Sequence, residues 1–418
     1  MSQSVNQITE CRICGSSKIV KFLSLGTQPW CDNFLKDSDL IKSEPTYPLE
    51  LFFCNDCSLV QLGYTVAKET MFLDYVYLSG TTKSLKEHFK STAEHIVTKF
   101  NLSSKDFVVD IGSNDGTFLE QFKNLNLKVL GVDPGKKQAE LAKEKGIETI
   151  NDFFNEKISE DILTKFGKAS IISAAGVFFH LEELHSVVKG IKKLLSEKGV
   201  FVIQATYLPS MIEKNAFDIV YHEHLVFYTI KTLQNLLSKY HLEIFDAEQN
   251  PIHGGSIIAY VSHPGKYSIS SNVNELLTYE EENGFNQLAK YEEFSKKVGQ
   301  IKENLLKIIH KVKDENKIIY GYGAPAKGNT MLNYCGIDSK LVDFLVETND
   351  LKCDLYAPGS KIKIIHEKDV SQLPDYYLIL PWNFLTSFIE KEKQFLQTGG
   401  RFIVPIPEPK ILEYSDIQ

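Results

Sequence analysis

The sequence predicts an α/β protein of three parts, in which a small metal-binding module precedes two domains built around parallel sheets. Two C-x-x-C pairs lie within the first sixty residues. Strand-like segments, glycine turns and helix-like segments then alternate from about residue 106, and a shorter alternation of the same kind follows residue 315. The length of 418 residues agrees with several domains, because a chain of this size exceeds one ordinary core.

The composition is typical of a globular protein, with 43% hydrophobic and 24% charged residues. The net charge of −8 argues against a protein that wraps nucleic acid, since such proteins usually present a basic face. We find no apolar run of membrane-spanning length, and the first residues lack the plan of a secretory signal. We therefore expect a cytoplasmic protein with neither a nucleic-acid nor a membrane partner.

The two C-x-x-C pairs predict a structural zinc site. In a reducing compartment such pairs are more often metal-binding turns than disulfides, and four thiolates complete the tetrahedral coordination of Zn²⁺. The predicted ligands are Cys11, Cys14, Cys54 and Cys57. The alternative, two unrelated reduced pairs, is disfavoured by their identical spacing. The remaining thiols are interpreted as ordinary core or surface groups, namely Cys31, Cys335 and Cys353.

The alternation also sets the domain boundaries. A lead-in helix is expected from about Thr82, and a further helix after Thr229, which is a reasonable N-cap. Residues 242–263 predict a hairpin that closes the first sheet, and the charge-rich residues 274–315 predict one or two long helices. We expect a zinc-binding module at 1–75, a central domain at 76–268, a helical connector at 269–314 and a smaller α/β domain at 315–418.

The turn DIGSNDG at 110–116 follows a strand and opens a helix, which is the position of a cofactor-binding turn. A dinucleotide turn requires G-x-G-x-x-G, whereas here carboxylates that would repel phosphate occupy the turn. They suit the sulfonium and ammonium of S-adenosylmethionine, and an acidic residue about twenty positions on can bind ribose hydroxyls. The candidate cofactor residues are Asp110, Gly112, Asn114, Asp115, Gly116 and Asp133. A turn without a ligand would leave them unexplained together.

A second glycine turn, GYGAPAKG at 321–328, carries Lys327 and no acidic partner. A phosphate or pyrophosphate is one interpretation, with Lys327 and backbone N–H groups as donors. The alternative is a turn that serves packing alone.

Residues 217–229, FDIVYHEHLVFYT, place Tyr221, His222, Glu223 and His224 side by side. Three interpretations compete: a solvated loop, a metal site, and acid–base groups beside a substrate. The stretch is not H-E-x-x-H, and two histidines alone make a poor metal site. In an extended stretch, Tyr221 and Glu223 would face one side while His222 and His224 face the other.

Acid–base groups at this density favour methylation of carbon, which requires a carbanion equivalent. A neutral histidine can remove a proton beside a ketone, and a tyrosine or second histidine can stabilise the enolate oxygen. Glu223 would orient the base, and His180 would lie on the same carboxyl edge of the sheet, although alone it is more often a helix-start residue. Methylation of oxygen or nitrogen would need less machinery.

Several motifs together resemble the zinc-containing sugar C-3 methyltransferases, which act on nucleotide-linked 4-keto-deoxysugars. The resemblance spans nearly the whole chain. It rests on the two C-x-x-C pairs, DYVYLSG at 74–80, DIGSNDG at 110–116, FFHLEEL at 178–184, YHEHLVFYT at 221–229, PIHGGS at 251–256 and GYGAPAKGNTMLN at 321–333.

The resemblance implies a zinc module, a central class I methyltransferase (Rossmann-like) domain that binds S-adenosylmethionine, and a C-terminal Rossmann-like domain without a dinucleotide. It implies that His224 removes the C-3 proton, supported by Tyr221, Glu223 and His180, and that Tyr75 lies near the methyl donor. The residues expected to bind the sugar nucleotide are His253, Gly323, Lys327 and Asn329.

We therefore expect a monomeric C-methyltransferase that acts on C-3 of a dTDP- or GDP-linked 4-keto-6-deoxy sugar. One alternative is an oxygen- or nitrogen-methyltransferase on a related sugar nucleotide. Another is a zinc-ribbon nucleic-acid binder whose methyltransferase fold is inactive, which the acidic charge and the intact DIGSNDG turn disfavour.

Overall fold

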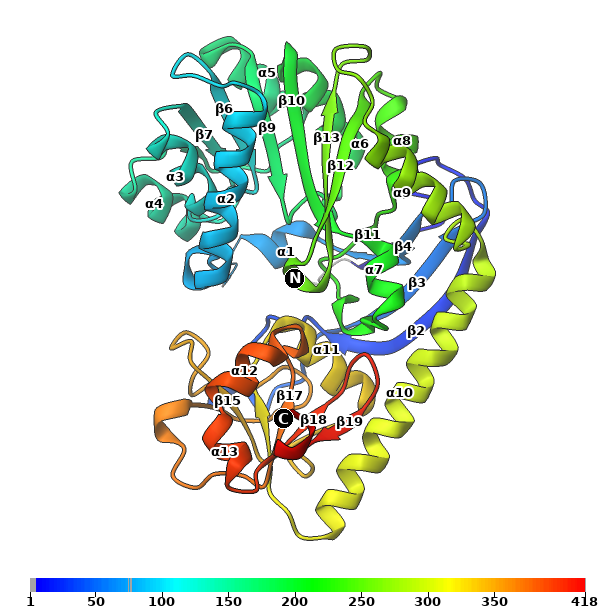
Figure 1. Ribbon diagram of the computed structural model, residues 1–418, viewed down its shortest axis with the longest axis vertical. Coiled ribbons are helices and arrows are strands. Elements are labelled where there is room, and N and C mark those ends of the chain that lie inside the picture. Colours follow the sequence, from blue (N-terminus) through cyan, green and yellow to red (C-terminus); the bar gives the residue numbers. More distant parts are fainter. Residues whose placement is uncertain (1–4, 74, 76, 418) are drawn as a thin grey trace.

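The computed structural model describes residues 5–73, 75 and 77–417, apart from the side chain of His253. Figure 1 shows a central α/β domain at one end of the molecule and a second α/β domain at the other, with N-terminal strands and a long helix running along one side between them. Within the described ranges, no helix combines the length and the apolar character needed to cross a membrane.

The central sheet contains five parallel strands closed by an antiparallel hairpin. The parallel strands are β6 (Phe107–Ile111), β7 (Lys128–Val132), β8 (Thr149–Ile150), β9 (Ala169–Ala175) and β10 (Leu195–Thr206), and the hairpin is β12 (Glu243–Asn250) with β13 (Ser256–Ser262). Their order is β12-β13-β10-β9-β6-β7-β8. The main helices of this domain are α2 (Lys83–Lys99), α3 (Thr117–Asn124), α4 (Lys136–Glu144), α5 (Glu156–Phe166), α6 (Leu184–Leu194) and α8 (Ile230–Ser238). The alternation and the hairpin expected from the sequence are both present.

Both faces of this sheet are buried, as in a sheet covered by helices on two sides. Neighbouring residues Val108 and Val109 of β6 belong to different apolar clusters, one on each face. Thr229 caps α8 as predicted, since its hydroxyl accepts the Thr232 N–H at 3.1 Å. The buried Glu280 adds a second cap, because its carboxylate accepts the Ile230 N–H at 2.6 Å.

The N-terminal strands form a sheet that includes a piece of the central domain. Its strands are β2 (Ile19–Pro29), β3 (Thr46–Cys54), β4 (Val60–Leu62) and, from the other domain, β11 (Val226–Phe227), in the order β11-β4-β3-β2. A separate pair joins β1 (Val5–Gln7) to β5 (Tyr64–Val66), and α1 (Lys68–Phe72) follows. Because β11 lies directly after the residues YHEH, this sheet anchors the candidate acid–base segment.

The C-terminal domain follows α9 (Ser271–Glu282) and α10 (Leu288–Asp314). Its sheet contains β14 (Ile319–Tyr322), β15 (Phe344–Glu347), β16 (Ile364–His366), β17 (Tyr376–Ile379), β18 (Arg401–Val404) and β19 (Lys410–Leu412), in the order β16-β15-β14-β17-β18-β19. Only the pairing of β19 is antiparallel within it. The helices are α11 (Ala326–Cys335), α12 (Leu385–Lys391) and α13 (Lys393–Gln397).

Further short helices in the described part of the chain are α7 (Leu208–Glu213), η1 (Asp37–Asp39), η2 (Ser79–Thr81), η3 (Phe217–Ile219), η4 (Ile252–Gly254), η5 (Glu367–Asp369), η6 (Trp382–Phe384) and η7 (Tyr414–Ile417). The boundary expected at residue 75 falls between α1 and η2, that at 268 falls between β13 and α9, and that at 314 coincides with the end of α10.

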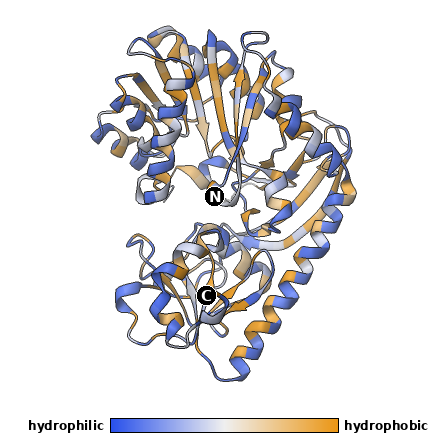
Figure 2. Ribbon diagram, in the orientation of Figure 1, coloured by the Kyte–Doolittle hydropathy of each residue, from blue (hydrophilic) through white to orange (hydrophobic). Residues whose placement is uncertain are grey.

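The long helix α10 joins the N-terminal sheet to the C-terminal domain through one core. Its buried side chains recur every three or four residues, and Figure 2 shows hydrophobic patches along an otherwise hydrophilic helix. The largest apolar cluster combines Leu51 of β3, Val298 of α10 and Leu345 of β15, with many others. The N-terminal segment is therefore not an isolated module, because β2 and β3 share this core with α10 and the C-terminal domain.

Candidate active site

The four predicted zinc ligands converge at the end of the N-terminal sheet. Their Sγ atoms all lie within 4.8 Å of one another, with Cys11 and Cys57 at 3.5 Å and Cys14 and Cys54 at 3.5 Å. A tetrahedron with Zn–S bonds of about 2.3 Å places its sulfurs about 3.8 Å apart, so the arrangement fits a zinc ion. All four positions would be filled by protein, which is the arrangement of a structural site.

Tight turns and the central domain hold both cysteine pairs. The Gly15 N–H donates to the Cys11 carbonyl at 2.9 Å, and the Ser58 N–H donates to the Cys54 carbonyl at 2.8 Å. Two side chains reach the turns: Asn235 of α8 donates to the Cys57 carbonyl, and Lys239, the residue after this helix, donates to the Ile13 carbonyl. The zinc site therefore fixes the start of β2 against the central domain.

A pocket with an empty volume of about 930 Å³ opens at the carboxyl ends of β6, β7 and β9. This edge is where open α/β sheets bind ligands. Residues from the strand ends line it, namely Ile111, Gly112, Asn114, Val132, Asp133 and Gly176. Aromatic walls complete it with Phe72, Tyr75, Tyr77, Phe153 and Phe154, and His180 lies at its margin.

The polar groups of the pocket fit S-adenosylmethionine. Asp133, at the end of β7, is oriented by the backbone N–H groups of Asn114 and Gly135, each 2.8 Å from one of its carboxylate oxygens. Gly112 has φ 67°, and a Cβ there would lie 2.7 Å from Val177, so the turn requires glycine. The adenine and ribose of the cofactor suit an aromatic wall beside a fixed carboxylate.

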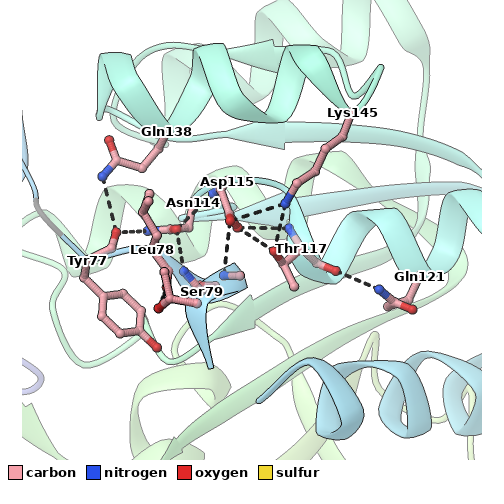
Figure 3. A network of polar contacts seen from close by, with 11 residues as sticks. Tyr77, Leu78, Ser79, Asn114, Asp115, Thr117, Gln121, Gln138 and Lys145 are labelled. Carbon is pink, nitrogen blue, oxygen red and sulfur yellow. Dashed lines mark hydrogen bonds and ion pairs between the residues drawn. The ribbon is translucent and has the colours of Figure 1, made fainter. Parts of the chain in front are cut away.

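Asn114 and Asp115 have a further role that the sequence did not reveal. Figure 3 shows them bonded to the segment 77–80. Asn114 Oδ1 accepts the Ser79 N–H at 3.0 Å, and Asp115 Oδ2 accepts the Gly80 N–H at 3.1 Å. Gln138 Nε2 donates to the carbonyl of Tyr77 as well. The glycine turn therefore holds in place the segment that carries Tyr77 and Ser79 into the pocket.

Three of the predicted cofactor residues do not line the pocket. Asp110 is buried in the sheet and accepts the Ser173 hydroxyl at 2.6 Å, and burial raises its pKa to about 7. Asp115 accepts the backbone N–H and the hydroxyl of Thr117 at the start of α3 and pairs with Lys145 at 3.3 Å. A Cβ on Gly116 would lie 2.8 Å from Ile147, so this glycine permits close packing. A direct role of these three in cofactor binding stays a prediction.

The acid–base segment is a turn and not an extended strand. The His224 N–H donates to the Tyr221 carbonyl at 2.9 Å, which brings residues three apart to one side, and the Tyr221 and His224 rings lie 3.8 Å apart. The alternation expected for an extended stretch, with these two residues on opposite sides, is therefore wrong. The His222 ring does not pack with these two rings, and its Nε2 lies 3.2 Å from the Tyr47 carbonyl oxygen.

His224 has a defined tautomer. Its Nδ1 lies 2.7 Å from the Ile219 carbonyl oxygen, which can only accept a hydrogen bond. In the neutral ring the proton is therefore on Nδ1, and Nε2 carries the lone pair. The ring packs edge-on against Phe179 at 4.6 Å and stacks with His180 at 5.1 Å. A base needs a fixed ring orientation of this kind.

His180 lies between His224 and the pocket. Burial lowers its pKa to about 3, so the ring is neutral at physiological pH. Its Nε2 is buried and has no hydrogen-bond partner among the described residues, although the ring stacks on Phe72. A buried polar atom of this kind indicates a place for a ligand atom.

Glu223 turns away from His224 toward the N-terminal segment. Its carboxyl oxygens lie 2.7 Å from Trp30 Nε1 and 3.0 Å from the Tyr75 hydroxyl. Burial, followed by the charge of Asp32, raises the pKa of Glu223 to about 8. His224 is thus oriented by the Ile219 carbonyl, whereas Glu223 contacts Tyr75 in the pocket wall. Trp30 and Asp32 are site residues that the sequence analysis did not identify.

Three of the predicted sugar-nucleotide residues, Gly323, Lys327 and Asn329, lie in the C-terminal domain, outside the pocket lining. Lys327 is half-buried, donates to Asn383 and lies over the Trp382 ring at 4.6 Å. Asn329 donates to the Cys31 carbonyl at 2.7 Å, and its Oδ1 is buried without a described partner. Gly323 has φ 78° and sits against Pro381. The side chain of His253 lies outside the described part, but its neighbour Gly254 would meet Trp382 with an added Cβ at 3.4 Å.

This fold and site define a zinc-containing, S-adenosylmethionine-dependent methyltransferase. Three family models match in order: a zinc binding domain over 11–72, a methyltransferase domain over 85–247 and a C-methyltransferase C-terminal domain over 251–407. The chain belongs to the C-methyltransferase family. It is 33% identical to the C-methyltransferase NovU of Streptomyces niveus over 414 residues, which cover 99% of each chain.

Two solved methyltransferase structures resemble part of the chain. An S-adenosylmethionine-dependent methyltransferase from Anabaena variabilis is 15% identical with a TM-score of 0.35, over 43% of this chain and 85% of its own. One from Clostridium acetobutylicum is 14% identical with a TM-score of 0.35, over 44% of this chain and 94% of its own.

Proposed function

We propose that the enzyme adds a methyl group to C-3 of a nucleotide-linked 4-keto-6-deoxy sugar, through an enolate formed by His224. The observation that carries this proposal is the orientation of His224. Its Nδ1–H is fixed on the Ile219 carbonyl, and its ring contacts His180 at the margin of the methyl-donor pocket. A base is required when the methyl group is transferred to a carbon beside a ketone, because that carbon must first lose its proton.

The residues around His224 suit the stages of such a reaction. The base removes the C-3 proton, and the negative charge moves to the C-4 oxygen. The hydroxyl of Tyr221, whose ring is 3.8 Å from that of His224, and His180 Nε2 are the candidate donors to this oxygen. Because burial keeps His180 neutral, it can carry a proton on Nε2 and donate it. S-adenosylmethionine, when bound, would supply the methyl group from its sulfonium.

The nucleotide is assigned to the space between the central and C-terminal domains. The loop 251–256, which resembles a substrate loop, approaches Trp382, and Lys327 lies over the same ring. Lys327 faces the buried Asp218, whose carboxylate partly balances its charge. A diphosphate bound there would therefore meet the α11 N-terminus together with a lysine that is already positioned.

Transfer to oxygen or nitrogen is the competing reaction, and product analysis separates the two. The protein is incubated with a donor carrying a ¹³C-methyl group and with dTDP- or GDP-linked 4-keto-6-deoxyhexoses. We expect a methyl resonance coupled to a sugar carbon at C-3, with His224→Asn as the inactive control. A methyl group attached to oxygen or nitrogen would contradict the proposal.

A further inference from the structure

The residues Trp30, Cys31 and Asp32 enter the active site from the N-terminal segment. They follow β2, which Figure 1 shows curving between the two domains. Trp30 Nε1 donates to Glu223, and the Cys31 carbonyl accepts from Asn329 of α11, so both domains hold this short stretch in place. Its position beside Glu223 needs an explanation, because it brings a second buried carboxyl group into the site.

Asp32 and Glu223 form a close pair of buried carboxyl groups. Asp32 is 8% exposed and Glu223 is 1% exposed, and an oxygen of each lies within 4.8 Å of the other. Two carboxylates so close in a buried site do not both ionise at neutral pH. Burial raises the pKa of Asp32, and burial together with the Asp32 charge raises that of Glu223 to about 8.

The surrounding groups decide where the single negative charge lies. Cys31, Tyr75 and Tyr221 face the pair as neutral groups, because burial raises their pKa values well above the usual range. His222 and His224 lie on the same turn as Glu223, with Nε2 of His222 directed to Tyr47 and Nδ1 of His224 to Ile219.

A cation from the C-terminal domain breaks the symmetry of the pair. Lys352 lowers the pKa of Asp32 by its charge, and its ammonium is fixed by the Ala324 carbonyl at 2.8 Å. The charge is therefore favoured on Asp32 and the proton on Glu223.

We propose that Asp32 is a positioning residue for methyl transfer, which shares one proton with Glu223 and keeps Glu223 in its acid form beside Tyr75. This inference rests on the proposed function and assigns a role to a residue outside the YHEH turn.

The protonation of Glu223 sets the direction of the hydrogen bond to Tyr75. When Glu223 is ionised, its carboxylate accepts a hydrogen bond from the Tyr75 hydroxyl, whose O–H then points away from the pocket. When Glu223 is protonated, its own O–H can donate to the Tyr75 oxygen across the 3.0 Å contact. The O–H of Tyr75 can then turn toward the pocket that Tyr75 lines. A phenol that donates into the pocket can stabilise the oxygen on which charge develops.

The first test follows the ionisation of Glu223 without substrate or turnover. The chain has two tryptophans, and Trp30 bonds directly to Glu223. The protein is labelled with 5-fluorotryptophan, and Trp30→Phe identifies the resonance of Trp30. We expect this resonance to titrate with a midpoint near pH 8, to move to lower pH by about one to two units in Asp32→Asn, and to stop titrating in Glu223→Gln. An unmodified protein whose Trp30 signal does not titrate between pH 6 and 9 would overturn the inference.

The second test is the pH profile of methyl transfer. In the unmodified enzyme, kcat falls on the alkaline side as Glu223 ionises, and Asp32→Asn moves this fall toward lower pH by the same amount as the Trp30 signal. Asp37→Asn, at an exposed position a few residues further on, leaves the profile unchanged. An Asp32→Asn enzyme with lower kcat but an unshifted profile would contradict the role of Asp32. The nature of the methylated product is independent of this result, so the two proposals fail separately.

Metal analysis tests the remaining alternative, a metal ion bound by Cys31, Asp32 and Glu223. The Sγ of Cys31 and a carboxylate oxygen of each acid all lie within 4.8 Å of one another. We expect one zinc ion per chain in the unmodified protein and in Asp32→Asn. A second metal ion that is lost in Asp32→Asn would overturn the shared proton.

Discussion

The imidazole rings of His180 and His224 are stacked, with their centroids 5.1 Å apart and their planes inclined by 23°. One follows β9 and the other lies before β11, so two loops of the carboxyl edge converge at this contact. Because burial keeps His180 neutral, it would not oppose a positive charge on His224, the base that we propose. The pair joins this proposed base to the pocket at the carboxyl edge of the sheet.

His224→Asn is expected to lower kcat by roughly 100- to 10,000-fold, the usual contribution of a general base. The affinity for S-adenosylmethionine should change little, because His224 does not line that pocket. Turnover assays and calorimetric titration of the donor measure the two quantities separately. The matched control is His222→Asn, whose ring bonds to the Tyr47 carbonyl and should keep most activity per folded molecule. Equal losses in both variants would refute the assignment.

Asp133→Asn is expected to weaken donor binding by roughly 10- to 100-fold, since an oriented carboxylate in the pocket is lost. Asp110 lies near the end of the neighbouring strand β6, but its carboxylate accepts the Ser173 hydroxyl within the sheet. Asp110→Asn should therefore leave donor affinity within a few-fold of the original. Calorimetric titration of the two variants tests this contrast, and the reverse order of effects would show that the pocket is misassigned.

Zinc removal is expected to destabilise the protein without touching the reacting atoms. Ile19 at the start of β2 pairs with Cys54, whereas Pro29 at its end precedes Trp30, so the strand's 11 residues separate the zinc site from Glu223. Cys54→Ser should lose zinc and lower the thermal midpoint strongly, because structural zinc contributes directly to folding. Cys353→Ser should keep both zinc content and midpoint. A zinc-free protein with an unchanged midpoint would contradict a structural role.

His222 should give a pH-dependent contribution to stability. Burial lowers its pKa to about 4, below that of the unfolded chain near 6.5, so its contribution is complete above pH 6.5 and is lost as the pH falls toward 4. His222→Asn should therefore be less stable than the unmodified protein at pH 7, and the gap should shrink by about 2 kcal/mol at pH 5. Urea unfolding at the two pH values measures the gap. A gap independent of pH would mean that the pKa of His222 in the folded protein is the same as in the unfolded chain.

The features predictable from the sequence are those encoded over short distances. The C-x-x-C turns, the glycine turn after β6 and the N-cap at Thr229 each depend on neighbouring residues, and the structure contains all three. The position of Asp133 was also predictable from the sequence, since it comes directly after the strand that follows the turn.

Contacts between distant segments account for what the sequence did not reveal. Trp30 meets Glu223 across 193 positions, and the Asn114 side chain binds Ser79 across 35. Neither pairing leaves a periodic pattern, although one of only two tryptophans placed beside a cysteine and an aspartate was an available signal. The sequence analysis interpreted the turn 110–116 only as a ligand-binding group. The position of the segment 77–80, which forms hydrogen bonds with this turn, could not be predicted from the sequence.

Hydrogen exchange at C-3 of the sugar tests the central claim most directly. The enzyme is incubated in deuterated water with S-adenosylhomocysteine and a nucleotide-linked 4-keto-6-deoxyhexose that it methylates. Deuterium should enter C-3 with the unmodified enzyme and at a rate at least 100-fold lower with His224→Asn. Undiminished exchange in His224→Asn, or no exchange at C-3 in an enzyme that still transfers methyl groups, would contradict an imidazole base acting on carbon.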